Sequence, residues 1–508
     1  MRNRDTWGDA LIKESALKED VKLRPHQEEA IQYVRERGGR GLLAHSTGTG
    51  KTLSSIAAFE ALKADGKAKR ALVVAPAALL TNFAENGVGK FTNSSFGPHG
   101  SNADYQLVSL ETFRNNPAKV LAAAKPDTLI VDEMHRAKDP NSQTYAALAH
   151  AAKDRGIKNM LGLTGSMVSN HPKDIIPLLN LVDPKHKLGS QSKFTREHVG
   201  ADKISGGFLT PPGQRYTLMN KDDLRRKAGG AVHYVGHEDI GTDGMPRLNI
   251  KDVPVQMSDE QHKLYNFAMG KLSPQSRALI RAGLPPSQSE AEHIFGMITK
   301  LRQASNSVGT HMNISPAEAA ERTPKLKRAI EDAVEHLAKT PDGQAVLYSN
   351  LVQGGARELH AGLKKRGIDA GLYTGPNAEL GVDNQTREQD VRDFLAGKKR
   401  AIVLTPAGSE GLSLNNATFF GAVDSHFNPE RNAQAIARAR RFGGLAHRPV
   451  DQRVVDVRRY HSQPITPFYR RLLGAQDVGV DEWISRVAAE KDRLNEEMRA
   501  LARERTPK

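Results

Sequence analysis

The sequence contains no cysteine, and this absence excludes several classes of protein at once. Without thiols the chain has no disulfides, no cysteine-ligated zinc and no cysteine nucleophile, which fits a reducing compartment. Residues 1–20 are polar and mixed in charge and lack the apolar core of a secretory signal. No apolar run is long enough to span a bilayer. We therefore expect an intracellular protein that is neither secreted nor membrane-bound: cytoplasmic, nucleoid-associated or, if viral, in the host cytoplasm.

The chain has fewer acidic than basic residues. The chain has 58 Asp and Glu against 73 Lys and Arg, a formal net charge of +15. Such an excess favours a polyanionic partner, most often nucleic acid, and a merely solvated basic surface is the alternative. Hydrophobic residues still make up 38% of the 508 residues, so the chain can build two to four domains with large cores.

Short apolar segments alternate with helical patterns in two separate groups. Because the segments are continuously apolar, they predict parallel strands covered on both faces, and hence two α/β lobes. In the first lobe we expect strands at 41–44, 71–75, 107–110, 129–131 and 160–163, and helices at 25–37 and 52–64. In the second we expect strands at 345–349, 371–373, 401–404, 419–423 and 454–457, and helices at 356–365, 386–395 and 432–441.

The segments outside these lobes are more polar. Residues between the lobes are predicted to be mostly helical and contain the basic run Arg225-Arg226-Lys227, and residues 481–503 predict one long charged helix. The predicted domains are therefore 1–184, 185–323, 324–462 and 463–508.

A glycine-containing loop joins the first predicted strand to a helix, Ser46-Thr47-Gly48-Thr49-Gly50-Lys51-Thr52. Glycines let backbone N–H groups approach phosphates closely. Lys51 is suited to the β- and γ-phosphates of a nucleotide, and the Thr52 hydroxyl to Mg²⁺. Ala44-His45 stands where the motif usually has its first glycine, and an ordinary turn is the alternative interpretation.

An acidic pair, Asp132-Glu133, ends the predicted strand at 129–131. Ligands of open α/β sheets bind at the carboxyl ends of strands, so the pair is suited to a nucleotide site. Asp132 is a candidate Mg²⁺ ligand, and Glu133 a candidate base that orients and deprotonates water. A simple capping pair is the alternative, and His135 alone would indicate little.

Two arginines, Arg438 and Arg441, lie three residues apart in a helical pattern of the second lobe. Guanidinium groups stabilise the charge that spreads over a transferred γ-phosphate. In isolation the segment is better explained as a solvated basic helix, but the upstream phosphate loop and acidic pair favour arginine fingers.

Together these motifs resemble superfamily 2 helicases and, within them, the Swi/Snf type of DNA translocase. The resemblance extends from about residue 20 to 495, through Leu23-Arg24-Pro25-His26-Gln27, Leu163-Thr164-Gly165-Ser166, the segments at 178–184, 257–265 and 405–414, and Asp424-Ser425-His426-Phe427-Asn428-Pro429. It implies two RecA-like lobes, a helical insertion and a C-terminal brace helix. It also implies ATP and Mg²⁺ as cofactors, with Thr52 and Asp132 at the metal.

The resemblance assigns roles to further residues. Nucleotide contacts are implied for Gln27, Thr47, Gly48, Thr49, Gly50, Glu410 and Gly411. Coupling between hydrolysis and movement is implied for His135, Thr164 and Gln434. Nucleic-acid contacts are implied for Pro76, Ser109, Thr112, Ser349 and Thr405, and we add Arg225, Arg226 and Lys227 as candidates from the basic run.

Four residues depart from the family pattern: Met134 replaces Gly or Ala, Met167 replaces Pro, Phe427 replaces Trp and Gly444 replaces Gln. None of them removes a catalytic group, and they point to a divergent branch such as a viral or phage one. The implied function is ATP-dependent translocation on double-stranded DNA by opening and closing of the two lobes. A strand-separating DExH-type helicase on DNA or RNA and a non-enzymatic nucleic-acid clamp are the alternatives.

Overall fold

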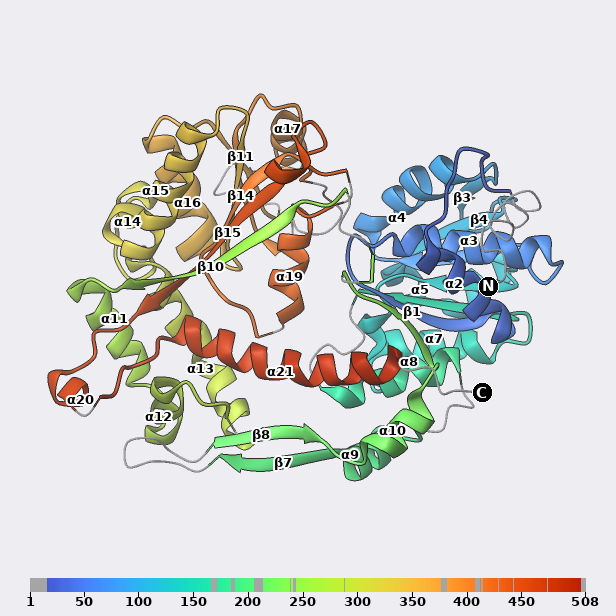
Figure 1. Cartoon of the computed structure of the whole chain (residues 1–508), viewed down its shortest axis with the longest axis horizontal. Coiled ribbons are helices and arrows are strands. Elements are labelled where there is room, and N and C mark those ends of the chain that lie inside the picture. Colours follow the sequence, from blue (N-terminus) through green and yellow to red (C-terminus); the bar gives the residue numbers. More distant parts are fainter. Residues whose placement is uncertain are drawn as a thin grey trace. The chain divides into compact units, whose positions relative to one another are not determined.

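The computed structural model describes residues 16–165, 171–183, 188–204, 213–237, 239–240, 244–286, 288–375, 382–406, 412, 414–427, 429–441, 443–472 and 474–503 (Figure 1). The chain divides into two compact units, which are described separately. Unit 1 comprises Met1–Gly200, Thr217–Gly241 and Arg493–Lys508, and unit 2 comprises Ala201–Tyr216 and Thr242–Asp492. In the part of the chain described, no helix combines the length and the apolar character needed to cross a membrane.

Unit 1 is built on a seven-stranded sheet in the order β3-β4-β2-β5-β6-β1-β9, and every neighbouring pair is parallel. Its strands are β1 (Arg40–His45), β2 (Ala71–Ala75), β3 (Phe96–Pro98), β4 (Tyr105–Ser109), β5 (Thr128–Val131), β6 (Asn159–Thr164) and β9 (Val232–Val235). The central strands β2, β5 and β6 are buried along their whole length, as their continuous apolar runs predict.

The helices of unit 1 are α2 (Pro25–Glu36), α3 (Lys51–Ala64), α4 (Ala77–Phe83), α5 (Leu110–Asn115), α6 (Pro117–Ala124), α7 (Gln143–Lys153), α8 (Ile175–Val182), α9 (Gln191–His198) and α10 (Lys221–Ala228). One core cluster joins α2 and α3 to the sheet through fully buried side chains that include Ile31, Phe59, Tyr105 and Leu161. The core therefore holds α3, which begins at Lys51, firmly against the strands.

Unit 2 contains a six-stranded parallel sheet in the order β10-β15-β14-β11-β13-β12. Its strands are β10 (Arg247–Gln256), β11 (Gln344–Tyr348), β12 (Ala370–Tyr373), β13 (Ala401–Leu404), β14 (Ala417–Ala422) and β15 (Val454–Gln463). Its helices are α11 (Asp259–Met269), α12 (Pro274–Ala282), α13 (Gln288–Asn306), α14 (Pro316–Arg322), α15 (Pro324–Lys339), α16 (Arg357–Lys365), α17 (Asn384–Leu395), α19 (Pro429–Ala437) and α20 (Phe468–Leu472). The long helix α21 (Val480–Arg503) begins in unit 2.

The predicted α/β class and the two parallel sheets are confirmed. The expectation of a mostly helical segment at 185–323 is wrong in part, because this segment also holds β9, β10 and the two-stranded pair β7 (Val199–Ile204) and β8 (Gly213–Leu218). β10 is an edge strand with mostly exposed side chains, and its apolar residues alternate with polar ones. That alternation marks a half-covered strand, and Pro254 is tolerated there because an edge strand needs fewer backbone donors.

The helix predicted at 432–441 lies earlier in the chain than expected, since α19 begins at Pro429 and ends at Ala437. The next three residues form tighter hydrogen bonds to the third residue back, from Arg438 N to Ala435 O and onward to Arg440 N. Gly443 then adopts φ +77°, which ends the helical path. Arg438 and Arg441 therefore lie on the turn that follows the helix.

Candidate nucleotide and nucleic-acid site

The motif residues of unit 1 follow the carboxyl ends of neighbouring strands. β1 leads into the loop at 46–50, β5 into Asp132 and Glu133, and β6 ends at Thr164. β2 leads into Pro76 in the same way, and β4 ends at Ser109. Because these strands are all parallel, their carboxyl ends lie along one edge of the sheet, which is where ligands bind in this class of fold.

The loop at 46–50 has the backbone of a phosphate-binding loop. Gly48 and Gly50 have φ values of +88° and +91°, which other residues rarely adopt. Thr49 is buried, and its hydroxyl donates to the carbonyl of Ser46 over 2.8 Å. The loop runs straight into α3, whose first backbone N–H groups have no intrahelical acceptors and can bind an anion.

Gln27, one of the predicted nucleotide contacts, lies against this loop. Its Oε1 accepts a hydrogen bond of 2.9 Å from the backbone N–H of Arg24. A methyl group placed on Gly50 would come within 2.6 Å of the Gln27 Nε2. Gly50 is therefore required both for its positive φ and for the close approach of the glutamine side chain.

The acidic pair lies beside the phosphate-loop lysine. The Lys51 Nζ is 3.2 Å from the Asp132 Oδ1 and 3.3 Å from the Glu133 Oε1. Burial lowers the pKa of Lys51, but the charges of Asp132 and Glu133 outweigh it, so the net pKa is raised. The lysine is therefore a permanent cation, positioned next to two carboxylates.

The two carboxylates are not equivalent. Burial raises the pKa of Asp132, and the nearby Lys51 offsets this only in part. Burial raises the pKa of Glu133 as well, but Lys51 and His135 more than reverse that effect and lower it below its usual value. Glu133 has φ +50°, a rare backbone conformation for a residue with a side chain, which turns it toward both neighbours. It is thus held ionised.

The predicted coupling residues of unit 1 lie next to one another. His135, in the short helix η2 (Met134–Ala137), has its Nδ1 3.2 Å from the Glu133 Oε2 and 3.3 Å from the Thr164 Oγ1. Gly165, the residue after Thr164, lies close to the phosphate loop, since a methyl group on it would be 3.1 Å from the Thr47 Oγ1. The end of β6 therefore adjoins both the acidic pair and the phosphate loop.

The unusual Met134 is accommodated by a glycine on the neighbouring strand. Met134 is 1% exposed, and a methyl group on Gly162 of β6 would come within 2.1 Å of its sulfur. The thioether occupies the space that a side chain at 162 would need. This departure from the family pattern is therefore a packing substitution.

Three histidines near the phosphate loop were assigned no role from the sequence. His45, the last residue of β1, is fully buried, and its Nε2 lies 2.8 Å from the Nδ1 of His233 on β9. The His26 Nε2 is 2.9 Å from the Thr49 carbonyl oxygen. Burial lowers the pKa of His26 and, well below its ordinary value, that of His45. His45 stands where the motif usually has glycine, but nothing in the sequence connects it with a residue 188 positions away.

The nucleic-acid contacts predicted in unit 1 differ in accessibility. Pro76 is buried before α4, and Thr112 is exposed on α5. Ser109 caps α5, because its Oγ accepts the backbone N–H of Thr112 over 3.1 Å. Thr112 therefore presents a side chain to solvent at the edge where the phosphate loop lies, and Ser109 sets the start of its helix.

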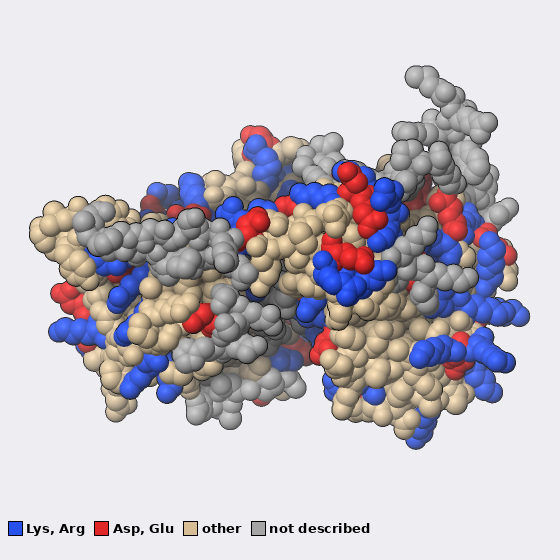
Figure 2. All heavy atoms as spheres, turned by 90° about the horizontal axis from the view of Figure 1, so that it is seen from below, with Lys and Arg blue, Asp and Glu red and all other residues tan. Residues whose placement is uncertain are grey.

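The basic run lies on α10 among acidic side chains. Arg225 pairs with Asp222 over 2.6 Å, and Arg226 pairs with Asp223 over 3.1 Å. Lys227 pairs with Asp223 over 2.7 Å. On the face drawn in Figure 2, basic and acidic side chains likewise lie next to one another. A phosphate contact by this run would have to replace existing ion pairs.

In unit 2, Ser349 and Thr405 are both buried at strand ends. The Ser349 hydroxyl donates to the Asp424 Oδ2 over 2.5 Å, and the backbone N–H of Thr405 donates to the Tyr373 carbonyl over 3.1 Å. Asp424 also accepts from the side-chain amide of Asn306 over 2.9 Å. Ser349 therefore positions the segment after β14, whichever other contacts it makes.

The polar network continues to the C-terminal helix through a pair that the sequence did not reveal. The Nζ of Lys325 on α15 lies 2.6 Å from the Oδ1 of Asn306 and 2.6 Å from the Oδ2 of Asp481 on α21. Lys325 and Asp481 are 0% and 1% exposed, so this is a fully buried ion pair. It attaches the start of α21 to the core of unit 2.

The two arginines follow α19, which carries Gln434 as a half-exposed residue. The Arg438 carbonyl accepts the backbone N–H of Leu414 over 3.0 Å, which fixes the start of the turn. Burial, and then the neighbouring charge of Arg438, lower the pKa of Arg441 to about 10. The two guanidinium groups repel each other, so an anion such as a phosphate would be stabilised between them. Glu410, Gly411 and Met167 lie outside the described residues.

Comparison with known proteins agrees with this arrangement. Residues 26–310 match the SNF2-related domain, and residues 328–443 match the helicase conserved C-terminal domain. An uncharacterised ATP-dependent helicase of Bacillus subtilis is 24% identical over 444 residues, which cover 82% of this chain and 73% of that protein. The DNA repair and recombination protein RAD54 of rice is 30% identical over 492 residues, covering 83% of this chain and 48% of the rice protein.

The fold has a counterpart among solved structures. The Hef helicase domain of Pyrococcus furiosus aligns with a TM-score of 0.52 at 16% identity, over 88% of this chain and 97% of that one. The first family match includes the phosphate loop and the acidic pair, and the second includes the arginine turn. The chain belongs to the SNF2-related family and is a helicase-like, nucleic-acid-dependent ATPase.

Proposed function

We propose that this chain is an ATP-dependent translocase on double-stranded DNA that hydrolyses ATP to ADP and phosphate with Mg²⁺ as cofactor. The observation that carries the proposal is the contact of Lys51, Glu133 and His135 at the end of a parallel sheet. Lys51 supplies an ammonium group and Glu133 a carboxylate base. His135 contacts that base and would couple its state to the rest of the unit. That combination suits phosphoryl transfer to water.

The residues of unit 1 fit a Mg²⁺-bound nucleotide. The loop at 46–50 offers backbone N–H groups, Lys51 a charge for the β- and γ-phosphates, and Thr52 and Asp132 oxygen ligands of the kind Mg²⁺ prefers. The metal would supply neutralisation of phosphate charge. On nucleotide binding Lys51 would exchange its carboxylate contacts for phosphate contacts. Glu133 would then be free to orient and deprotonate the attacking water.

Hydrolysis in this proposal also requires unit 2. Unit 1 contains the base and the lysine but not the arginine turn, whose two cations suit the charge that develops on the γ-phosphate. Closure of the units around the nucleotide would bring the arginines to it, and release would separate them. Alternating affinity of the two states for the DNA backbone would then drive movement.

Double-stranded DNA is proposed as the track because the chain belongs to the SNF2-related family and because its rice relative is a DNA repair and recombination protein. The net charge of +15 supports binding through phosphates, which is independent of base sequence. A strand-separating helicase is the second candidate, favoured by the likeness of the fold to the Hef helicase domain.

The test compares ATPase rates with duplex DNA, single-stranded DNA and RNA, and then two displacement assays on the same protein. We expect duplex DNA to stimulate most, and we expect displacement of a third strand from a triplex without separation of a forked duplex. Lys51→Ala serves as the inactive control. Efficient fork unwinding would instead support the helicase, and stimulation mainly by RNA would exclude the DNA assignment.

A further inference from the structure

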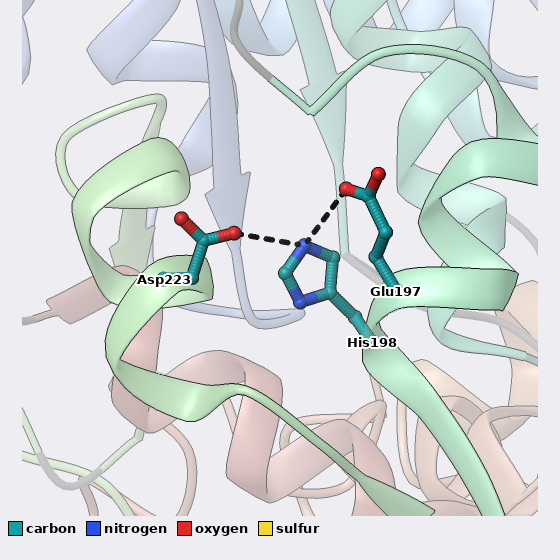
Figure 3. A group of neighbouring side chains, drawn as sticks. All are labelled: Glu197, His198 and Asp223. Carbon is teal, nitrogen blue, oxygen red and sulfur yellow. Dashed lines mark ion pairs between the residues drawn. The ribbon is translucent and has the colours of Figure 1, made fainter.

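A buried histidine outside the nucleotide site lacks the partners that burial normally requires. His198, the last residue of α9, is 0% exposed, and neither of its ring nitrogens has a hydrogen-bond partner among the described residues. Leaving a buried polar group unsatisfied costs about 1–3 kcal/mol. Its Nε2 points toward two carboxylates, at 3.5 Å from the Asp223 Oδ2 and 4.0 Å from the Glu197 Oε2 (Figure 3).

Imidazole nitrogen and carboxylate oxygen are both ligands of zinc in proteins. With metal–ligand bonds of about 2.0–2.1 Å, tetrahedral ligand atoms are about 3.3 Å apart. The distances of 3.5 and 4.0 Å approach this spacing, and all three ligand atoms lie within 4.8 Å of one another. We propose that Glu197, His198 and Asp223 bind a divalent transition-metal ion, with Zn²⁺ as the preferred ion.

Lys227 shows that this position already attracts a cation. Its Nζ lies 2.7 Å from the Asp223 Oδ2 and 3.5 Å from the Glu197 Oε2, the same two oxygens that face His198. The ammonium group satisfies the carboxylates but leaves both imidazole nitrogens without a hydrogen bond among the described residues. A metal ion satisfies all three ligands, so it competes with Lys227 and is favoured by the contribution of the imidazole.

The surroundings allow this exchange. The Lys227 side chain is 24% exposed and flexible, and a surface hollow of about 440 Å³ adjoins it. Glu197, Asn220, Lys221, Asp222, Asp223 and Lys227 line the hollow. The lysine can therefore move into solvent while an ion enters from the same side. Three protein ligands would leave one coordination position for water.

A bound ion would fasten α9 to α10. The residues between these helices form the β7–β8 pair, which starts directly after His198. The ion would thus join the two points at which the chain leaves unit 1 for the β7–β8 pair and returns to it. The role of the bound ion is structural. Its affinity depends on Lys227, because the ammonium group competes with the ion for the same two carboxylates.

The experiment titrates the full chain, without nucleotide, with Co²⁺ and Zn²⁺. Co²⁺ is followed by its visible absorption, and Zn²⁺ by competition with a chromophoric chelator. We expect one site in the wild type, weakened by about tenfold or more in His198→Gln. Lys227→Met removes the competing cation and should tighten the site by roughly threefold or more. His150→Gln, on the exposed side of α7, is the matched control and should bind as the wild type does.

The outcomes distinguish a metal site at Glu197, His198 and Asp223 from an ordinary cluster of ion pairs. If His198→Gln does not fold, as judged by circular dichroism, Asp223→Asn removes another ligand from a half-buried position and should weaken the site similarly. Zn²⁺ should also raise the unfolding temperature of the wild type but not of these variants. Equal affinity in wild type and ligand variants, or unchanged affinity in Lys227→Met, would overturn the proposal. None of these readouts depends on ATPase activity.

Discussion

Asp132 and Glu133 are adjacent in sequence, yet their carboxyl groups have opposite pKa shifts. Lys51 contacts both, but only Glu133 also contacts His135. The sequence motif predicted an Mg²⁺ ligand and a water-activating base at these two positions, because carboxylates serve as both. The sequence could not predict which carboxylate is held ionised, because that depends on burial and on the direction set by the positive φ of Glu133.

Glu133→Gln tests the base directly. The amide keeps the shape of the side chain but cannot accept the proton, so we expect ATP to remain bound while kcat falls by about a hundredfold or more. Nucleotide binding is measured by fluorescence and turnover by phosphate release. Glu85→Gln, an exposed glutamate of unit 1, should be unaffected. Normal turnover in Glu133→Gln would refute the assignment of the base.

The buried histidines make a prediction about acid stability. Burial holds the pKa of His45 well below that of an unfolded chain, so below about pH 6.5 the unfolded state gains a proton that the folded state resists. The free energy of unfolding should therefore fall as the pH drops from 7.5 to 5.5. His45 should contribute up to about 1.4 kcal/mol per pH unit.

His45→Gln should reduce this pH dependence, as measured by denaturant unfolding at several pH values. The slope is compared rather than the absolute stability, since the substitution also removes the contact with His233. The exposed His150→Gln should leave the slope unchanged. An identical slope in wild type and His45→Gln would show that the folded protein protonates His45 without cost.

At the scale of the elements, the continuous apolar runs predicted the strands of both sheets well. β2 and β13 begin and end at the residues expected, because fully buried strands leave a signal that polar neighbours do not interrupt. β9 and β10 were missed, since they lie at sheet edges and are held by pairing with β1 and β15 over long chain separations. The arginine segment was misassigned because Arg and Ala favour helix, and only Gly443 signals its end.

The turn after α19 should matter for hydrolysis rather than for binding. Arg441→Ala removes a guanidinium group that is suited to the transition-state charge, so we expect a fall in kcat of about a thousandfold with nearly normal ATP affinity. Arg438→Ala should have a similar or milder effect. Arg392→Ala, on the exposed side of α17, is the matched control. If both turn variants hydrolyse ATP normally, the turn is only a basic surface.

At the scale of the molecule, the net charge of +15 predicts binding that weakens steeply with salt. The contribution of α10 to this salt dependence should be smaller, because its cations are already paired with Asp222 and Asp223. Replacing Arg225, Arg226 and Lys227 together by alanine should lower the slope of log K against log salt. The decrease should be at most about 0.9 per lost contact and smaller where the ion pairs persist.

Fluorescence anisotropy on a labelled duplex at several salt concentrations measures this slope. A triple variant of Lys327, Lys339 and Arg392 removes the same charge from exposed positions of unit 2. If α10 contacts DNA, its triple variant should change the slope more than the control does. Equal changes would assign the effect to net charge alone.

The place of β9 at the end of the first sheet has a consequence for any attempt to isolate that lobe. β9 covers the outer side of β1 over four paired residues, from Leu42 to His45. A fragment cut at residue 184 would turn β1 into a bare edge strand, with the backbone donors and acceptors of a largely apolar segment open to other chains. Self-association would then begin at the strand that leads into the phosphate loop, and nucleotide binding and solubility would be lost together.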